Sequence, residues 1–217
     1  MSEHLFLFID ESGDPGYGNL DSSEYYAELA LSIIDDYFSD FNRPILNWRY
    51  NRNLIKEMKR PPKKGDDIKL FTQPFSELHS MGIIKCACVY LIKEQYSGPY
   101  LKPTSYGGQQ PKRFRNFIHR QLLEYYFSLY PVMPDSVEIV FDRFEVSDED
   151  IDELEKYLTE NWNLPNFKHF THANSVYVEA LQIVSQLVNL VQEIILEKAT
   201  FERSLVDFVS VKDITTI

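Results

Sequence analysis

Two aspartates that end hydrophobic runs are the residues with the clearest potential for chemistry. Asp10 ends the run FLFID, and Asp142 ends the run EIVFD. Catalytic and ligand-binding groups in open α/β sheets gather at the carboxyl ends of strands, so adjacent parallel strands would bring these two carboxylates together. Such a pair repels itself unless a divalent cation neutralises it, and carboxylate oxygens suit Mg²⁺ or Mn²⁺. Taken singly, each Asp also fits the simpler role of starting a turn.

Three other acidic residues, Glu11, Asp14 and Asp67, follow Asp10 in the sequence. If the strand continues past Asp10, Glu11 must face its opposite side. Asp14 precedes a proline and is expected to make the turn. Asp67 lies in the segment DDIKLF, where a helix start or a loop is the simpler interpretation.

Positive charge is concentrated in one stretch of an acidic chain. The net charge of −11 argues against a nucleic-acid partner, yet residues 43–64 carry eight Lys or Arg against Glu57 alone. The basic residues are Arg43, Arg49, Arg52, Lys56, Lys59, Arg60, Lys63 and Lys64. This asymmetry permits a face that follows phosphates, with Trp48 and Tyr50 stacking on bases. A solvated helix and loop, with both aromatics packed in the protein, is the alternative.

Hydrophobic periodicity predicts one layered α/β domain. The expected strands span 4–10, 25–34, 83–92, 136–144 and 166–173. The expected helices span 47–60, 74–81, 112–129, 148–162 and 176–200. The first two strands read as a hairpin, and helices alternate with strands later in the chain. This order predicts a sheet of mixed antiparallel and parallel strands, flanked by helices.

Cysteines and hydropathy indicate a reducing, aqueous compartment. Cys86 and Cys88 share one apolar strand, where a buried and reduced structural pair is favoured over two metal ligands. No apolar run is long enough for a bilayer, and the start MSEHLFLF lacks signal-peptide features, so we expect a cytoplasmic protein without membrane contact. His119 is expected to be structural, whereas His169 and His172 could either contact a site or be ordinary residues. No Ser-His-Asp or Cys-His pattern is present.

The opening FIDESGDPG, followed by the strand ELALSII, resembles the signature of a family called domain of unknown function 3800. Its members have a ribonuclease H-like fold. The resemblance implies a single ribonuclease H-like domain over residues 1–200 and a tail at 201–217. Motif by motif, Asp10 matches the first acidic position of the family, Asp67 the second and Asp142 the third.

The last motif of the family resembles ALQIVSQLV, with Ser185 at the position of an Asp. In this helix an apolar stripe is predicted to be buried, formed by Ala180, Ile183, Val184, Leu187, Val191 and Ile194. The other side, with Glu179, Gln182 and Ser185, is expected to face solvent or to complete a metal site. Glu179 could replace the missing carboxylate, although about 9 Å of helix axis separates it from Ser185.

The resemblance implies a nuclease with two divalent ions, Mg²⁺ or Mn²⁺, about 4 Å apart. Asp10 would bridge both ions, and Asp67 and Asp142 would each hold one. Lys69 would stabilise the scissile phosphate, and the basic segment 43–64 would bind the RNA or DNA.

Two other functions remain open from the sequence. One is a catalytically degenerate protein that binds nucleic acid or protein, which Ser185 favours and the retained aspartates oppose. The other is a component of a phage-defence or toxin-like complex, with the partly apolar tail 201–217 docking a protein partner.

Overall fold

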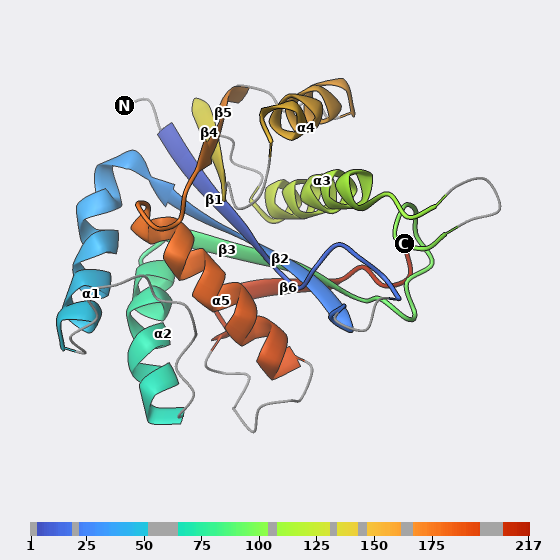
Figure 1. Cartoon of the computed structure of the whole chain (residues 1–217). Helices are drawn as coiled ribbons and strands as arrows, with labels where there is room; N and C mark the ends of the chain where they lie inside the picture. Colours follow the sequence, from blue (N-terminus) through green and yellow to red (C-terminus); the bar gives the residue numbers. More distant parts are fainter. Residues whose placement is uncertain are drawn as a thin grey trace.

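A six-stranded sheet with the strand order β5-β4-β1-β2-β3-β6 forms the middle of the fold (Figure 1). The structure, a computed structural model, describes residues 4–18, 22–51, 65–103, 108–130, 134–142, 147–161, 167–195 and 206–217. The strands are β1 (His4–Ser12), β2 (Tyr25–Ile34), β3 (Ile84–Ile92), β4 (Ser136–Asp142), β5 (Phe167–Ala173) and β6 (Val209–Asp213). The helices are the 3₁₀ helix η1 (Asp35–Tyr37), α1 (Phe38–Asn51), α2 (Gly65–Ser80), α3 (Pro111–Leu129), α4 (Asp148–Asn161) and α5 (Glu179–Ile195).

Strand pairing confirms the predicted mixed sheet. Strand β2 is antiparallel to both β1 and β3, which confirms the hairpin at the start of the chain. The pairs β1–β4, β4–β5 and β3–β6 are parallel. Strand β1 therefore lies between an antiparallel and a parallel neighbour. Its parallel pairing with β4 is the condition under which Asp10 and Asp142 come together.

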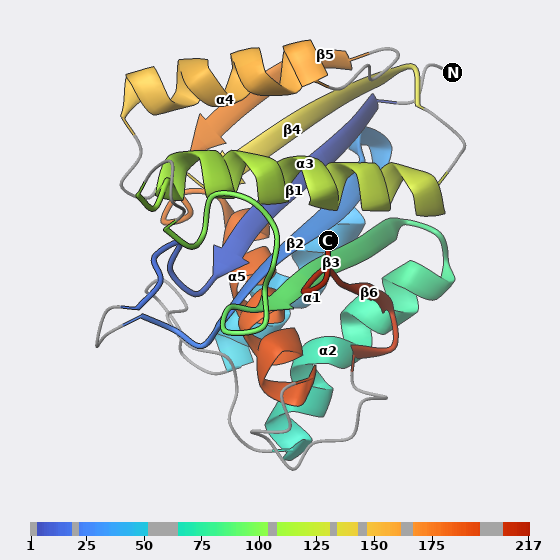
Figure 2. The same cartoon turned by 90° about the vertical axis from the view of Figure 1, so that its right-hand side faces the viewer.

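The helices form a layer on each face of the sheet, with α1, α2 and α5 on one face and α3 and α4 on the other (Figures 1 and 2). Alternate residues of β1 enter different cores, because successive side chains of a strand point to opposite faces. Phe8 packs in the core beneath α5, whereas Leu7 and Ile9 pack in the core beneath α3. Since both faces of β1 are covered, its sequence LFLFI is apolar at every position.

The turn after β1 is fixed by a glycine and by a buried ion pair. Gly13 has a φ of 96°, and a Cβ atom there would lie 2.4 Å from the carbonyl oxygen of Tyr25. Glycine avoids both the strain and the clash. Asp14 accepts hydrogen bonds from the backbone N–H of Ser23 (2.7 Å) and from Lys93 Nζ (3.1 Å). The Lys93 side chain is 2% exposed, so Asp14 both shapes the turn, as predicted, and neutralises a buried cation.

Helix limits differ from the prediction around the basic segment. Helix α1 begins at Phe38, ahead of the predicted start at residue 47, and residues 52–64 lie outside the described residues. Helix α2 begins well before Pro74 and continues through it, although proline removes one backbone hydrogen bond. The burial of Ile68 and Phe71 in the core stabilises this first half of α2.

The end of the chain belongs to the sheet, which corrects the expectation of a separate tail. Strand β6 pairs in parallel with β3 and extends the sheet beyond it. Val206, Phe208 and Ile214 are buried in the protein's own cores. These apolar side chains are therefore not available to dock a protein partner.

Two simpler expectations concern the cysteines and membrane spans. Cys86 and Cys88 are buried free thiols in β3, and burial raises the pKa of both, as suits a structural pair. Within the described part of the chain, none of the helices has the length and apolar character of a membrane-crossing segment.

Candidate functional site

Asp10, two residues before the carboxyl end of β1, lies close to Asp142, the last residue of β4. The parallel pairing of the two strands ends at Ile9 and Phe141, directly before the two aspartates, and the charge of Asp142 acts on Asp10. Asp10 is 7% exposed, and burial raises its pKa to about 8, with further increases from the charges of Glu11 and Asp142. The structure thus brings together the two carboxylates that the sequence singled out first.

Ser185 of α5 contacts Asp10 of this carboxylate pair. Its hydroxyl forms a hydrogen bond with the carboxylate of Asp10, which opposes the rise of the Asp10 pKa but is a smaller effect than burial. The backbone N–H of Glu11 also donates to Asp10 Oδ1, at 2.8 Å. Asp142 Oδ1 accepts a hydrogen bond from the backbone N–H of Ser175, at 3.2 Å. The position at which the resemblance expects an Asp therefore faces the pair, but it carries a hydroxyl group.

The polar side of α5 is buried or half-buried, which does not fit full solvent exposure, one of the two alternatives expected for it. Gln182 is 3% exposed and donates from Nε2 to the carbonyl oxygen of Ser175 at 2.8 Å. Gln186 is 1% exposed. Further along the helix, Asn189 Oδ1 accepts a hydrogen bond of 2.7 Å from the hydroxyl of Ser12 at the end of β1. Polar side chains of α5 therefore line the contact with the end of β1.

Glu179 and Arg49, two predicted site residues with different roles, bind each other. Arg49 Nη1 lies 3.2 Å from Glu179 Oε1, and the Arg49 side chain is 16% exposed. Glu179 is the first residue of α5, about 9 Å along the helix axis from Ser185. The structure therefore does not bring Glu179 to the Asp10–Asp142 pair, and Arg49 is engaged by a carboxylate.

The other basic residues expected to bind nucleic acid, Arg52, Lys56, Lys59, Arg60, Lys63 and Lys64, lie outside the described residues. Of the two aromatic residues near them, Trp48 packs edge-on against Phe71 with ring centroids 5.3 Å apart. Tyr50 is 84% exposed. Packing in the protein thus accounts for Trp48, and Tyr50 keeps a ring that a base can reach.

Asp67 and Lys69 lie on α2, away from the carboxylate pair. This helix packs against α1 and β3, whereas Asp10 and Asp142 lie near the carboxyl ends of β1 and β4. In both cartoons the first turn of α2 lies well below the end of β1 (Figures 1 and 2). Asp67 is half-buried in that first turn, and Lys69 is exposed. The sequence expectation that both join Asp10 is therefore not met.

A pocket of about 200 Å³ opens on the other face of the sheet. It lies where α3 and α4 meet the carboxyl ends of β1 and β4, and its lining includes Glu11, Arg115, Asn116, His119, Asp142 and His172. His172 stacks on Phe141 with ring centroids 5.2 Å apart. Asp142 is thus shared between this pocket and the Asp10 pair.

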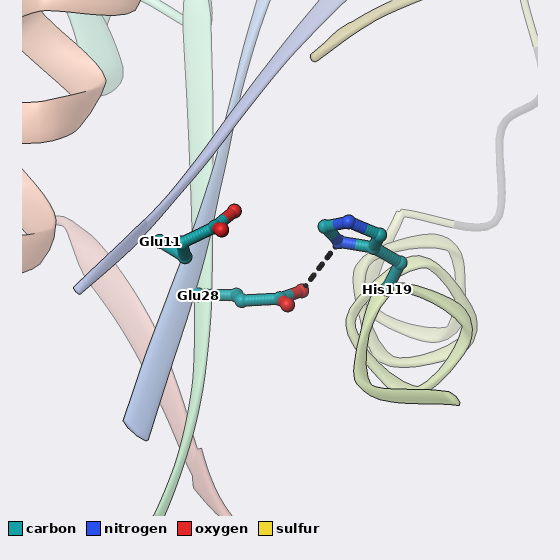
Figure 3. A group of neighbouring side chains, drawn as sticks. All are labelled: Glu11, Glu28 and His119. Atoms are coloured by element: carbon teal, nitrogen blue, oxygen red, sulfur yellow. Dashed lines mark hydrogen bonds and ion pairs between the residues drawn. The ribbon is translucent and has the colours of Figure 1, made fainter. Parts of the chain in front are cut away.

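Glu11 and His119 line this pocket, and both lie close to the fully buried Glu28 (Figure 3). One ligand atom from each lies within 4.8 Å of the others. His119 Nδ1 is 2.9 Å from Glu28 Oε2, and the hydroxyl of Tyr26 donates to Glu28 Oε1 at 2.9 Å. Arg115 Nε lies 3.0 Å from Glu11 Oε1. Burial raises the pKa of Glu11, and the charges of Arg115 and His119 oppose that rise.

Sequence reasoning missed this cluster, although its signals were present. The strand YYAELALSII contains one carboxylate, Glu28, among apolar residues, and the hairpin register places it opposite Glu11. His119 occurs on the apolar side of its helix between Phe114 and Leu122, all of which are buried. A charged or titratable group at an inward position indicates a partner in the core, and here the partner comes from 91 residues away.

Comparison with known proteins gives no family assignment, because no family model and no curated protein matches the chain. The resemblance to domain of unknown function 3800 thus rests on its motifs, and the function has to be argued from the site itself.

Proposed function

We propose that this protein is a divalent-metal-dependent phosphodiesterase acting on nucleic acid, with a ribonuclease H-like fold of the domain of unknown function 3800 type. One observation carries the proposal: Asp10 and Asp142 lie together at the carboxyl ends of adjacent parallel strands. Functional groups of α/β sheets gather at such ends. The mixed sheet with helices on both faces is compatible with the proposed fold.

The carboxylate pair fits one hard divalent cation such as Mg²⁺ or Mn²⁺. Its donors are all oxygens, namely the carboxylates of Asp10 and Asp142 and the hydroxyl of Ser185. With its pKa at about 8, Asp10 binds a proton at neutral pH, and a cation would replace that proton. A second ion would need further carboxylates, and Asp67 and Glu179 lie elsewhere. We therefore propose one ion in place of two.

The residues of the chain would position this ion and the substrate. Asp10 and Asp142 would hold the ion, and the hydroxyl of Ser185 would orient the Asp10 carboxylate. When bound, such an ion supplies an activated water and neutralises charge on a phosphodiester. The nucleic-acid substrate is proposed from the charge of residues 43–64, which suits a phosphate backbone.

A second candidate function, binding without cleavage, is favoured by one observation. Ser185 offers Asp10 a hydrogen bond where a further carboxylate would be needed to complete a nuclease-type site. A protein of this kind would keep the nucleic-acid surface but hold no catalytic metal.

Cleavage assays separate the two functions. The purified protein is offered labelled single- and double-stranded RNA and DNA with Mg²⁺ or Mn²⁺, beside the double variant Asp10→Asn/Asp142→Asn. We expect metal-dependent cleavage that the double variant lacks and that Asp36→Asn, a change at an exposed aspartate, retains. Equal cleavage by the double variant would exclude the proposed enzyme. Binding that persists in every variant without any cleavage would establish the second candidate.

A further inference from the structure

We propose that Glu11, Glu28 and His119 form a separate binding site for a divalent transition-metal ion, best fitted by Zn²⁺, on the face of the sheet opposite Asp10. The site is independent of the proposed phosphodiesterase function. Three elements build it: β1 and β2 present the two carboxylates as a cross-strand pair, and α3 presents the imidazole above them (Figure 3).

The ligand types select the class of metal. Zn²⁺ binds imidazole nitrogen and carboxylate oxygen together, whereas Mg²⁺ and Ca²⁺ prefer sets made of oxygens alone. Three protein ligands also leave one zinc position for water or substrate. Glu11 and His119 both line the pocket, so that fourth position would open into it.

Neighbouring groups already hold the ligands as outer-shell partners do in metal sites. Tyr26 donates to Glu28 at 2.9 Å, and Arg115 lies 3.0 Å from Glu11. Each contact uses one carboxylate oxygen and leaves the other for the cluster. Such contacts orient carboxylate ligands and contribute to metal affinity.

The charge of the pocket also favours a cation. Four carboxylates line it against two permanently charged cations: Glu11, Asp142, Asp150 and Glu153 against Lys112 and Arg115. Both cations are already paired, Lys112 with Asp150 and Arg115 with Glu11. Glu28, behind the lining, adds a further carboxylate. A lining of this sign attracts a divalent cation and repels a free anion.

Asn116 adds an uncharged polar group to the pocket. Its residue is only 7% exposed, and it lines the pocket one helical turn before His119. Its amide can donate and accept hydrogen bonds, so it can meet a bound molecule or a water held by the metal.

Metal titration of the full chain tests the proposal. Zn²⁺ binding is measured by calorimetry in the Asp10→Asn background, which lacks one ligand of the proposed phosphodiesterase site and keeps Asp142, a lining residue of this pocket. We expect one equivalent of Zn²⁺ per chain and no comparable uptake of Mg²⁺. Glu11→Gln and His119→Gln should each weaken Zn²⁺ binding by at least about 100-fold, because outer-shell partners alone contribute 10- to 100-fold. His169→Gln, at an exposed histidine of β5, is the matched control and should change nothing.

Two results would overturn the proposal: no Zn²⁺ binding by the background protein, or binding that survives both Glu11→Gln and His119→Gln. Circular dichroism checks that each variant folds. If His119→Gln does not fold, Glu11→Gln decides, together with the visible spectrum of bound Co²⁺. A Co²⁺ spectrum identical in the Glu11→Gln variant and the background protein would place the ion elsewhere.

Discussion

Asp10 and Glu11 are consecutive in the chain, yet their carboxylates serve opposite faces of the sheet. Asp10 meets Ser185 of α5, whereas Glu11 meets Arg115 of α3. This follows from the alternation of a strand that continues to Ser12. One strand end therefore contributes to two chemically different environments, an all-oxygen pair on one side and a mixed carboxylate–imidazole cluster on the other.

Asp10→Asn is expected to stabilise the protein at neutral pH. The Asp10 pKa is about 8 in the folded protein against 3.8 for an ordinary aspartate, so between these values the folded state keeps a proton that the unfolded chain has lost. The contribution of Asp10 to the free energy of unfolding is greatest below pH about 4. It falls by up to about 1.4 kcal/mol per pH unit as the pH rises towards 8. Asn removes this slope, and the gain at pH 7 is on the order of 4 kcal/mol.

Urea unfolding at several pH values, with a chelator present, measures this difference. Asp36→Asn serves as the exposed control, and its free energy of unfolding should depend on pH as that of the unmutated protein does. The account of Asp10 is wrong if Asp10→Asn shows that same pH dependence.

Ser185→Asp is expected to tighten divalent-cation binding and to destabilise the protein without cations. It would add a carboxylate beside Asp10, and carboxylate count tunes cation affinity, so we expect roughly a tenfold gain for Mn²⁺. Without a cation the added repulsion should cost about 1–3 kcal/mol. Ser185→Ala removes the hydrogen bond to Asp10 without adding charge. Equal Mn²⁺ affinity of both variants in calorimetry would show that Ser185 does not belong to the cation site.

Gly13→Ala is expected to destabilise the turn after β1 by about 2–4 kcal/mol, because it combines a positive φ with a steric clash. The Cβ atom would lie 2.4 Å from the Tyr25 carbonyl oxygen. Gly82→Ala isolates the first effect, since Gly82 has a φ of 76° and nothing within 4 Å of the added atom. It should cost only about 1 kcal/mol. Thermal unfolding compares the two, and equal losses would refute the role of the clash.

Asp14→Asn is expected to cost about 2 kcal/mol, because it leaves the buried ammonium of Lys93 without its carboxylate. The matched control is Asp40→Asn, which breaks the exposed pair with Arg43 and should cost less than about 0.5 kcal/mol. Denaturant titrations at pH 7 measure both. A loss no larger for Asp14→Asn than for the control would show that the Lys93 pair contributes no more than a surface pair.

Local patterns were sufficient to predict most of the fold. The strand 25–34 and the helix 112–129 have continuous apolar faces, and both occur within a residue of the predicted limits. In both β1 and β4 an Asp after apolar residues lies near the carboxyl end, although β1 continues to Ser12 and β4 ends two residues before its predicted limit. Nothing in a local pattern fixes which distant residues meet, so neither the Arg49–Glu179 pair nor the separation of Asp67 from Asp10 could be anticipated. The position of His119 in an amphipathic helix predicts a structural role, and its partner Glu28 could not be anticipated because it is contributed by another element.

The place of β6 also bears on how the chain acquires its fold. Strands β1, β2 and β3 are consecutive antiparallel neighbours, so they can associate early in synthesis. The outer edge of β3 is then covered only when residues 209–213 emerge, more than a hundred residues later. Until that point the exposed backbone of β3 can pair with another nascent chain. Chains shortened before residue 209 should therefore self-associate, even though both carboxylate clusters lie in the part that remains.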